Sequence, residues 1–233
     1  MDCSTPYLQR LQLLTGLEGI KKLHEASVAV VGLGGVGSHA AEALARSGIG
    51  TMTLVDMDRI EESNLNRQLP ALLSTLGRYK TEITAERIQD INPFIKINKF
   101  TCRYEPASSE KILSVNPDYV IDAIDSIPDK AHLIRSCLIK GIPVVSSMGM
   151  ANRLDPLKIK VGDIKDTSVC PVARKLRKEL RNYGIHTGVT VVYSIEAPLK
   201  TWDENRASLG SIIYLPGIAG YLLASFIIQK III

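Results

Sequence analysis

Apolar and polar positions along this chain follow two periods, one typical of strands and one of helices. Short runs rich in Val and Ile recur, and between them apolar residues return at helical spacing. The predicted strands are Val28–Val31, Met52–Val55, Ile95–Phe100, Tyr119–Asp122 and Ile142–Ser146. The predicted helices are Gly35–Arg46, Arg78–Ile91, Ser108–Ser114 and Pro128–Lys140. Strands and helices in alternation form βαβ units, so the pattern predicts an α/β protein with a Rossmann-like, doubly wound and mostly parallel sheet.

The C-terminal third departs from this rhythm. Leu157–Val161 and Thr190–Glu196 have strand character, and a long connection between them contains a charged helix, Pro171–Asn182. These two strands are expected to extend the sheet or to pair antiparallel, so we expect an antiparallel extension of the sheet in the C-terminal third. Connections as long as this one are usually functional or mobile.

One uncharged stretch, Leu209–Ile228, is about as long as a membrane helix needs to be. Pro216, Gly217 and Gly220 interrupt it, and no basic cluster flanks both of its ends. We therefore expect no membrane span. The pattern predicts a short strand at Ser211–Tyr214, a turn, and a buried helix from about Gly217.

The composition is that of a globular protein, because 45% of the 233 residues are hydrophobic and 22% are charged. The formal charge of +4 permits a polyanionic partner without requiring one. The four cysteines, Cys3, Cys102, Cys137 and Cys170, form no Cys-x-x-Cys pair, which argues against a tetrathiolate zinc site. Cys102 is expected in a strand and Cys137 on an apolar helix face. The first residues show no signal-peptide pattern, so a cytoplasmic location is expected.

A glycine turn follows the first predicted strand and opens the first helix. It reads Gly32-Leu33-Gly34-Gly35-Val36-Gly37, and the next strand ends near Asp56. Glycines allow a backbone to approach phosphate, and the helix N-terminus supplies oriented N–H groups. An acidic residue about twenty positions further on can accept hydrogen bonds from a ribose. The turn therefore predicts a nucleotide site, and the glycines alone favour NAD.

The segment after Asp56 changes that expectation. It is long and polar and contains Asp58, Asn64, Arg67, Gln68 and Lys80. Hydride transfer needs no cations beyond those at the pyrophosphate, whereas cleavage of a triphosphate needs its leaving group stabilised. Arg67 can hold phosphate oxygens in a bidentate manner, and Lys80 can act as a point charge. Both residues are also compatible with solvated surface positions.

A third group of polar residues follows the predicted strand Tyr119–Asp122, where the chain reads Asp122-Ala123-Ile124-Asp125-Ser126. In open parallel sheets ligands bind at the carboxyl ends of the strands, so Asp125 should face the glycine turn. A carboxylate there can hold Mg²⁺ against phosphates. Asp125 or Ser126 can instead cap the following helix.

Together GLGGVG, Asp56, the run Asn64-Leu65-Asn66-Arg67-Gln68, Gly77-Arg78-Tyr79-Lys80 and DAIDS resemble the ThiF/MoeB/HesA family, prokaryotic relatives of ubiquitin-activating enzymes. The resemblance spans nearly the whole chain. It implies an enzyme that uses ATP and Mg²⁺ to adenylate a carboxylate, with one domain over 1–233. The nucleotide-binding half is 26–147, and 148–233 holds the substrate and crossover region and the C-terminal helix.

The resemblance also implies roles for individual residues. Gly32, Gly34, Gly35 and Gly37 would form the phosphate turn, and Asp56 would hold the ribose with Asp58 beside it. Asn64, Arg67, Gln68 and Lys80 would contact the triphosphate, and Asp125 would bind Mg²⁺. Arg10 matches an arginine that reaches the partner subunit's ATP site, which implies a homodimer. Cys170 falls where some members carry a reactive cysteine.

Within the family, the phrases ALARSGIG, VIDAIDSIPDKAHLI and CPVARKLRKEL are similar to the branch of tRNA threonylcarbamoyladenosine dehydratases. That branch implies a tRNA substrate, for which the cations Arg174, Lys175, Arg177, Lys178 and Arg181 provide a candidate contact. Three alternatives remain. One is adenylation of a ubiquitin-like sulfur-carrier protein, with a possible sulfur-transfer partner. The others are an NAD-dependent oxidoreductase and a non-catalytic nucleotide-binding protein.

Overall fold

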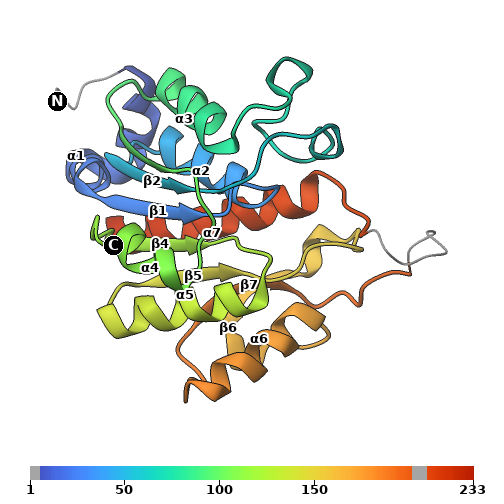
Figure 1. The fold of residues 1–233 in the computed structure, drawn as a ribbon. Coiled ribbons are helices and arrows are strands. Elements are labelled where there is room, and N and C mark those ends of the chain that lie inside the picture. The colour runs from blue at the N-terminus through green and yellow to red at the C-terminus, as the bar shows by residue number, and fades with distance from the viewer. Residues whose placement is uncertain (1–5, 201–208) are drawn as a thin grey trace.

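The computed structural model describes residues 6–200 and 209–233 of the chain (Figure 1). A seven-stranded sheet forms its centre, with the strand order β3-β2-β1-β4-β5-β7-β6. The strands are β1 (Ser27–Val31), β2 (Thr51–Val55), β3 (Lys96–Phe100), β4 (Tyr119–Asp122), β5 (Val144–Ser147), β6 (Ile159–Asp163) and β7 (Thr190–Ser194). All neighbouring strands are parallel except β6, which pairs antiparallel with β7 at one edge. The predicted fold class, with its antiparallel extension, is confirmed.

Helices cover both faces of this sheet because successive strand residues point to opposite sides. In β1, Val28 and Val30 belong to one core cluster and Ala29 and Val31 to the other. The helices that pack on the first cluster are α1 (Gln9–Glu25), α2 (Gly37–Arg46), α3 (Lys80–Ile91) and α7 (Tyr214–Ile232). Those on the second are α4 (Pro106–Leu113), α5 (Ile127–Lys140) and α6 (Pro171–Asn182). These two layers make the sheet a buried, doubly wound one.

The prediction of a strand at Ser211–Tyr214 is wrong. These residues form no strand, and α7 starts at Tyr214, with Pro216 in its first turn. The amide nitrogens of a first turn have no partner within the helix, so proline costs little there and does not delay the start of the helix.

By length and composition alone, helix α7 is long and apolar enough to cross a membrane, but about half of it is buried inside the protein. It lies against α2, where a side chain added at Gly220 would overlap the Val36 carbonyl oxygen (Figure 1). That close approach is typical of a core helix.

Two further differences concern short segments. Cys102 lies just beyond β3 rather than within a strand, whereas Cys137 is fully buried on α5 as expected. Burial raises the pKa of the Cys137 thiol to about 12, so it stays protonated in the core. The N-terminal helix α1 was not predicted, and its irregular backbone at Gly16 (φ 71°) divides its apolar pattern.

Candidate active site

The glycine turn packs directly against the loop that follows β4. Gly32 has a φ of 92°, and a Cβ there would lie 2.6 Å from the Ala123 carbonyl oxygen. The Ala123 amide donates a hydrogen bond of 2.8 Å to the Val31 carbonyl oxygen. Only glycine combines this backbone angle with so close an approach. The two loops at the carboxyl ends of β1 and β4 therefore pack together into one continuous surface.

Asp56 follows β2 directly and contacts the glycine turn. One carboxylate oxygen accepts a hydrogen bond from the Leu33 amide (2.7 Å), and the other accepts one from the Asp58 amide (2.8 Å). Burial raises the pKa of Asp56, while the nearby Lys80 and these amides oppose the rise. The carboxylate thus fixes the shape of the glycine turn and remains an acceptor beside it.

Lys80, the first residue of α3, is buried and faces the same region. Its ammonium group lies 2.6 Å from the carboxylate of Asp58, which is about half exposed. The Lys80 amide also donates to the Asp58 carbonyl oxygen at 3.0 Å. The Lys80 side chain is thus held in place by Asp58, and the solvent-exposed part of this ion pair is the Asp58 carboxylate.

Arg67 and Gln68 lie over the glycine turn from the polar connection. A Cβ at Gly35 would lie 3.3 Å from Arg67 Cγ, and one at Gly34 would lie 4.0 Å from Gln68 Nε2. The guanidinium of Arg67 donates to the Ser63 carbonyl oxygen (2.8 Å) and to Asn66 Oδ1 (2.7 Å). Gln68 Oε1 is buried without a hydrogen-bond partner among the described residues, and the Nε2 donor is the atom of this side chain that lies near Gly34.

Asn64 supports this connection from within. Its side-chain oxygen accepts a hydrogen bond of 3.2 Å from the Glu61 amide and caps the 3-10 helix Glu62–Asn64. The Arg67 amide donates a hydrogen bond of 3.1 Å to the Asn64 carbonyl oxygen, so the buried Asn64 helps to hold the backbone that carries Arg67.

Asp125 is exposed in the loop between β4 and α5. A buried network anchors this loop. Asp122 accepts hydrogen bonds from Lys130 Nζ (2.8 Å) and Ser146 Oγ (2.6 Å), and its other oxygen accepts one from the Ile124 amide (3.1 Å). Asp122, Lys130 and Ser146 are essentially inaccessible to solvent. The sequence analysis did not identify this network, because it depends on the β4–β5 register and on a helix turn that brings Lys130 back.

Two predicted residues do not join this cluster. Arg10 is exposed on α1, close to Leu8, which packs against Gly48 at the amino end of β2 (Figure 1). That is the opposite end of the sheet from the glycine turn. Cys170 precedes α6 and is buried in the core cluster beneath it. In this position its thiol packs and is not presented to a substrate.

His39, on α2, is a further buried polar residue of the site. Its Nε2 lies 3.4 Å from the Arg67 carbonyl oxygen, and its Nδ1 has no partner among the described residues. Burial lowers the pKa of His39, which keeps the imidazole neutral. It supports the backbone that carries Arg67 without adding charge.

A glycine turn, a carboxylate at the end of the second strand and two cations beside it define an α/β nucleotide-binding protein built for a phosphate chain. The model of the ThiF family matches residues 7–232, and the chain belongs to that family.

Individual relatives of known activity are similar to this chain over much of its length. The chain is 40% identical to the tRNA threonylcarbamoyladenosine dehydratase of Bacillus subtilis, with 95% of this chain and 93% of that protein covered. It is similar to the crystal structure of Escherichia coli tRNA N6-threonylcarbamoyladenosine dehydratase in complex with ATP, with a TM-score of 0.93 and 36% identity over 99% of this chain and 96% of that one. A sulfur carrier protein adenylyltransferase of Thermus thermophilus is 34% identical over 56% of this chain and 48% of its own length.

Proposed function

We propose that this protein is an ATP-dependent adenylating enzyme that dehydrates threonylcarbamoyladenosine in tRNA to a cyclic form. The observation that carries the proposal is that Arg67 and Gln68 lie against the glycine turn, while Lys80 pairs with Asp58 beside Asp56. The relative of Bacillus subtilis, similar over nearly its whole length, supports the choice of substrate.

The residues would divide the work on ATP as follows. Amides of the turn around Gly34 and Gly35 would meet the phosphates, and Asp56 would accept hydrogen bonds from the ribose hydroxyls. Arg67 and Lys80, with Asn64 and Gln68 nearby, would stabilise charge on the departing pyrophosphate.

Mg²⁺ fits the donors at this place. Proteins usually hold it through one or two carboxylates together with substrate phosphates and water, and Asp125 is an exposed carboxylate beside the turn. Bound there, the ion would neutralise charge on the phosphates. The network of Asp122 and Lys130 would keep the Asp125 loop in place before ATP arrives.

The reaction has two steps. A carboxylate oxygen of the threonylcarbamoyl group attacks the α-phosphorus of ATP, and the bond to the β-phosphate oxygen breaks to release pyrophosphate. A nucleophile of the same modified nucleoside then attacks the activated carbonyl carbon, loses its proton and expels AMP. The carboxylate oxygen leaves on AMP, so the nucleoside loses the elements of one water. Because the nucleophile is tethered, the second step is intramolecular and needs no enzyme nucleophile such as Cys170.

The protein is proposed to act in the cytoplasm as a homodimer. The resemblance assigns Arg10 to the ATP site of the partner subunit, and its position at the opposite end of the sheet from the glycine turn supports that assignment.

Adenylation of a ubiquitin-like carrier protein is the alternative within the family. The sequence contains no Cys-x-x-Cys pair, whereas the resemblance implies two such pairs in sulfur-carrier-activating members.

The test is pyrophosphate release from ATP by purified protein, with tRNA that carries threonylcarbamoyladenosine or with unmodified tRNA. The proposal predicts release only with the modified tRNA, together with loss of the mass of one water from the nucleoside. Release that instead requires a carrier protein with a free C-terminus would refute the choice of substrate and keep the adenylating chemistry.

A further inference from the structure

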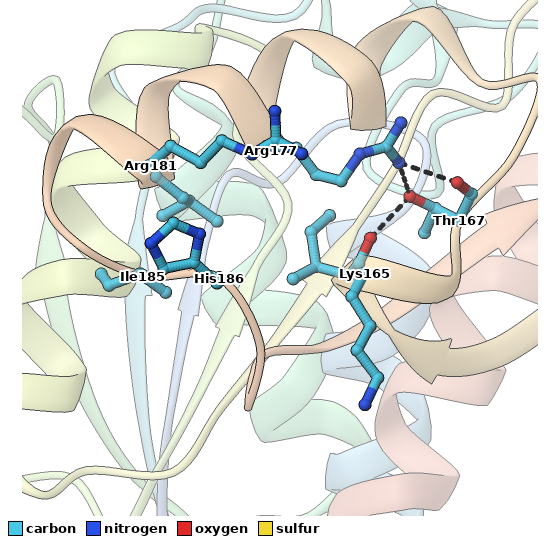
Figure 2. Close-up of a pocket in the computed structure, with 8 residues that line it drawn as sticks. Lys165, Thr167, Arg177, Arg181, Ile185 and His186 are labelled. Carbon is cyan, nitrogen blue, oxygen red and sulfur yellow. Dashed lines mark hydrogen bonds between the residues drawn. The ribbon is translucent and has the colours of Figure 1, made fainter.

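A polar cavity lies under α6, away from the glycine turn. Its volume is about 330 Å³, and Figure 2 shows its lining: Ile164, Lys165, Thr167, Arg177, Leu180, Arg181, Ile185 and His186. None of these residues is acidic. We propose that this cavity binds a backbone phosphate of the tRNA, at a distance from the modified nucleoside; the inference rests on the proposed function.

The first argument is that one guanidinium is oriented in advance. Arg177 donates from Nη1 to the Thr167 carbonyl oxygen at 2.8 Å and also to the Thr167 hydroxyl oxygen (Figure 2). That hydroxyl is itself fixed, because it donates to the Ile164 carbonyl oxygen at 2.7 Å. A guanidinium has five N–H donors, so the donors of Nε and Nη2 remain for a ligand. A fixed guanidinium loses little conformational entropy when it binds phosphate.

The second argument is the accumulation of unpaired positive charge. Arg181 follows Arg177 by one helix turn and lies beside it along the same side of the cavity (Figure 2). Across residues 6–200 and 209–233, neither Arg177 nor Arg181 makes an ion pair within 4.0 Å, and Arg181 is exposed. An accessible pair of arginines with no carboxylate partner is suited to an anion with several oxygens.

The third argument is that the acid just before the cavity segment, Asp163, already has hydrogen-bond partners. Its carboxylate accepts hydrogen bonds from the Lys165 amide (2.8 Å), the Gly188 amide (2.6 Å) and the Thr187 hydroxyl (3.0 Å). These donors lower the pKa of Asp163 and occupy its oxygens. The arginines therefore do not have Asp163 as a partner.

The remaining lining explains why the anion would be held at this spot. Ile164 and Leu180 are buried and give the cavity an apolar floor, which strengthens the attraction between a guanidinium and a phosphate oxygen. The side chain of Lys165 points away from the other lining residues (Figure 2), so the two arginines and His186 are the groups assigned to the ligand.

The proposal narrows the tRNA contact expected from the sequence, because the five cations of α6 fall into two sets. Arg177 and Arg181 line the cavity, whereas Arg174, Lys175 and Lys178 are exposed outside it. This division supplies a matched control, because Arg174→Gln removes the same charge from the same helix as Arg181→Gln.

The experiment measures binding of an unmodified tRNA transcript by fluorescence anisotropy over a series of salt concentrations. Arg181→Gln is expected to weaken binding roughly 3- to 10-fold and to reduce the slope of log affinity against log salt by about one. Arg174→Gln should change the affinity by less than about 2-fold, which is the effect expected of an ordinary exposed charge. Thr167→Val should weaken binding without loss of charge, and Thr167→Ser should restore it.

Equal weakening by Arg181→Gln and Arg174→Gln would overturn the proposal in favour of a diffuse surface field, and no weakening by either would overturn it outright. Thermal shifts with inorganic phosphate and with pyrophosphate test for a free anion. The proposal would also be overturned if phosphate or pyrophosphate raised the thermal midpoint of the wild-type protein, Arg181→Gln abolished that rise, and the variant still bound tRNA with wild-type affinity. If the wild-type protein dehydrates modified tRNA in these cases, the proposed function stands alone; if it neither binds nor modifies tRNA, the proposed function fails first.

Discussion

At the scale of single residues, the exposed Asp125 and the buried Asp122 sit three positions apart and have opposite surroundings. Asp122 is inaccessible and paired with Lys130, while Asp125 lies open at the end of the same strand. A buried carboxylate must be compensated, whereas an exposed one is available to a cation. Changes at the two positions are therefore expected to separate stability from activity.

Asp125→Ala is expected to abolish pyrophosphate release, by a factor of about 100 or more, because it removes the carboxylate proposed to hold Mg²⁺ against the phosphates. The thermal midpoint should stay at the wild-type value, since no core contact is lost. Asp90→Ala, at an exposed position of α3, is the control and should leave both quantities unchanged. Wild-type release by Asp125→Ala would show that the metal is held elsewhere.

Lys130→Met is expected to lower the free energy of unfolding by about 3–5 kcal/mol, because it leaves the Asp122 carboxylate buried without a counter-charge. Lys140→Met, which removes an exposed ion pair with Glu110, should cost about 0–1 kcal/mol. Urea unfolding of both variants measures the difference. Equal losses would mean that the buried pair contributes no more than the surface pair.

At the scale of elements, the sequence predicted most strands and helices but not how loops meet. The strands of the nucleotide-binding half lie within about two residues of their predicted places, because β-branched runs between helical periods have few other solutions. The prediction failed at Ser211–Tyr214, where apolar character alone suggested a strand. Pro216 lies in the first turn of α7, where it does not interrupt the helix. The Asp122–Lys130–Ser146 network could not be predicted, because three separate elements create it.

The packing of α2 on α7 depends on a neutral histidine. His39 lies 5.7 Å from Tyr221 between ring centroids, and a Cβ at Gly217 would lie 3.3 Å from the imidazole. Because burial lowers the pKa of His39, the unfolded chain takes up a proton at a higher pH than the folded chain. The contribution of His39 to stability is therefore complete above about pH 6.5 and is lost as the pH falls through its folded pKa.

The free energy of unfolding should accordingly decrease between about pH 7 and pH 5. His39→Gln should flatten part of that decrease, while Gln89→Ala, at an exposed position of α3, should retain the wild-type profile. Urea unfolding at a series of pH values makes the comparison. An unchanged profile in His39→Gln would show that the folded protein accepts the proton on this histidine without cost.

At the scale of the whole molecule, several of the residues predicted to bind ATP lie around the glycine turn, whereas Arg10 does not. The described chain places Arg10 near the amino ends of the strands and the glycine turn at their carboxyl ends. Topology explains why most of the site was predictable, since the carboxyl ends of parallel strands meet at one edge. A residue supplied by a second copy is not determined by that rule, so Arg10 came only from the resemblance.

Mixing two inactive variants tests the proposed exchange. In a heterodimer of Arg10→Ala with Lys80→Ala, one site has both an intact Lys80 and a partner's intact Arg10. Purified heterodimers should regain up to about half of wild-type pyrophosphate release, and an equimolar random mixture about a quarter, as simple site counting predicts. Verified heterodimers without recovery would contradict a role for Arg10 across subunits.

The central claim is that a carboxylate of the substrate becomes bonded to AMP, and transfer of oxygen tests this most directly. Modified tRNA is prepared with heavy oxygen in the threonylcarbamoyl carboxylate, and AMP is analysed by mass spectrometry after a single turnover. The account predicts AMP that carries one heavy oxygen and a nucleoside lighter by one water. Unlabelled AMP alongside cyclised nucleoside would contradict adenylation of the carboxylate.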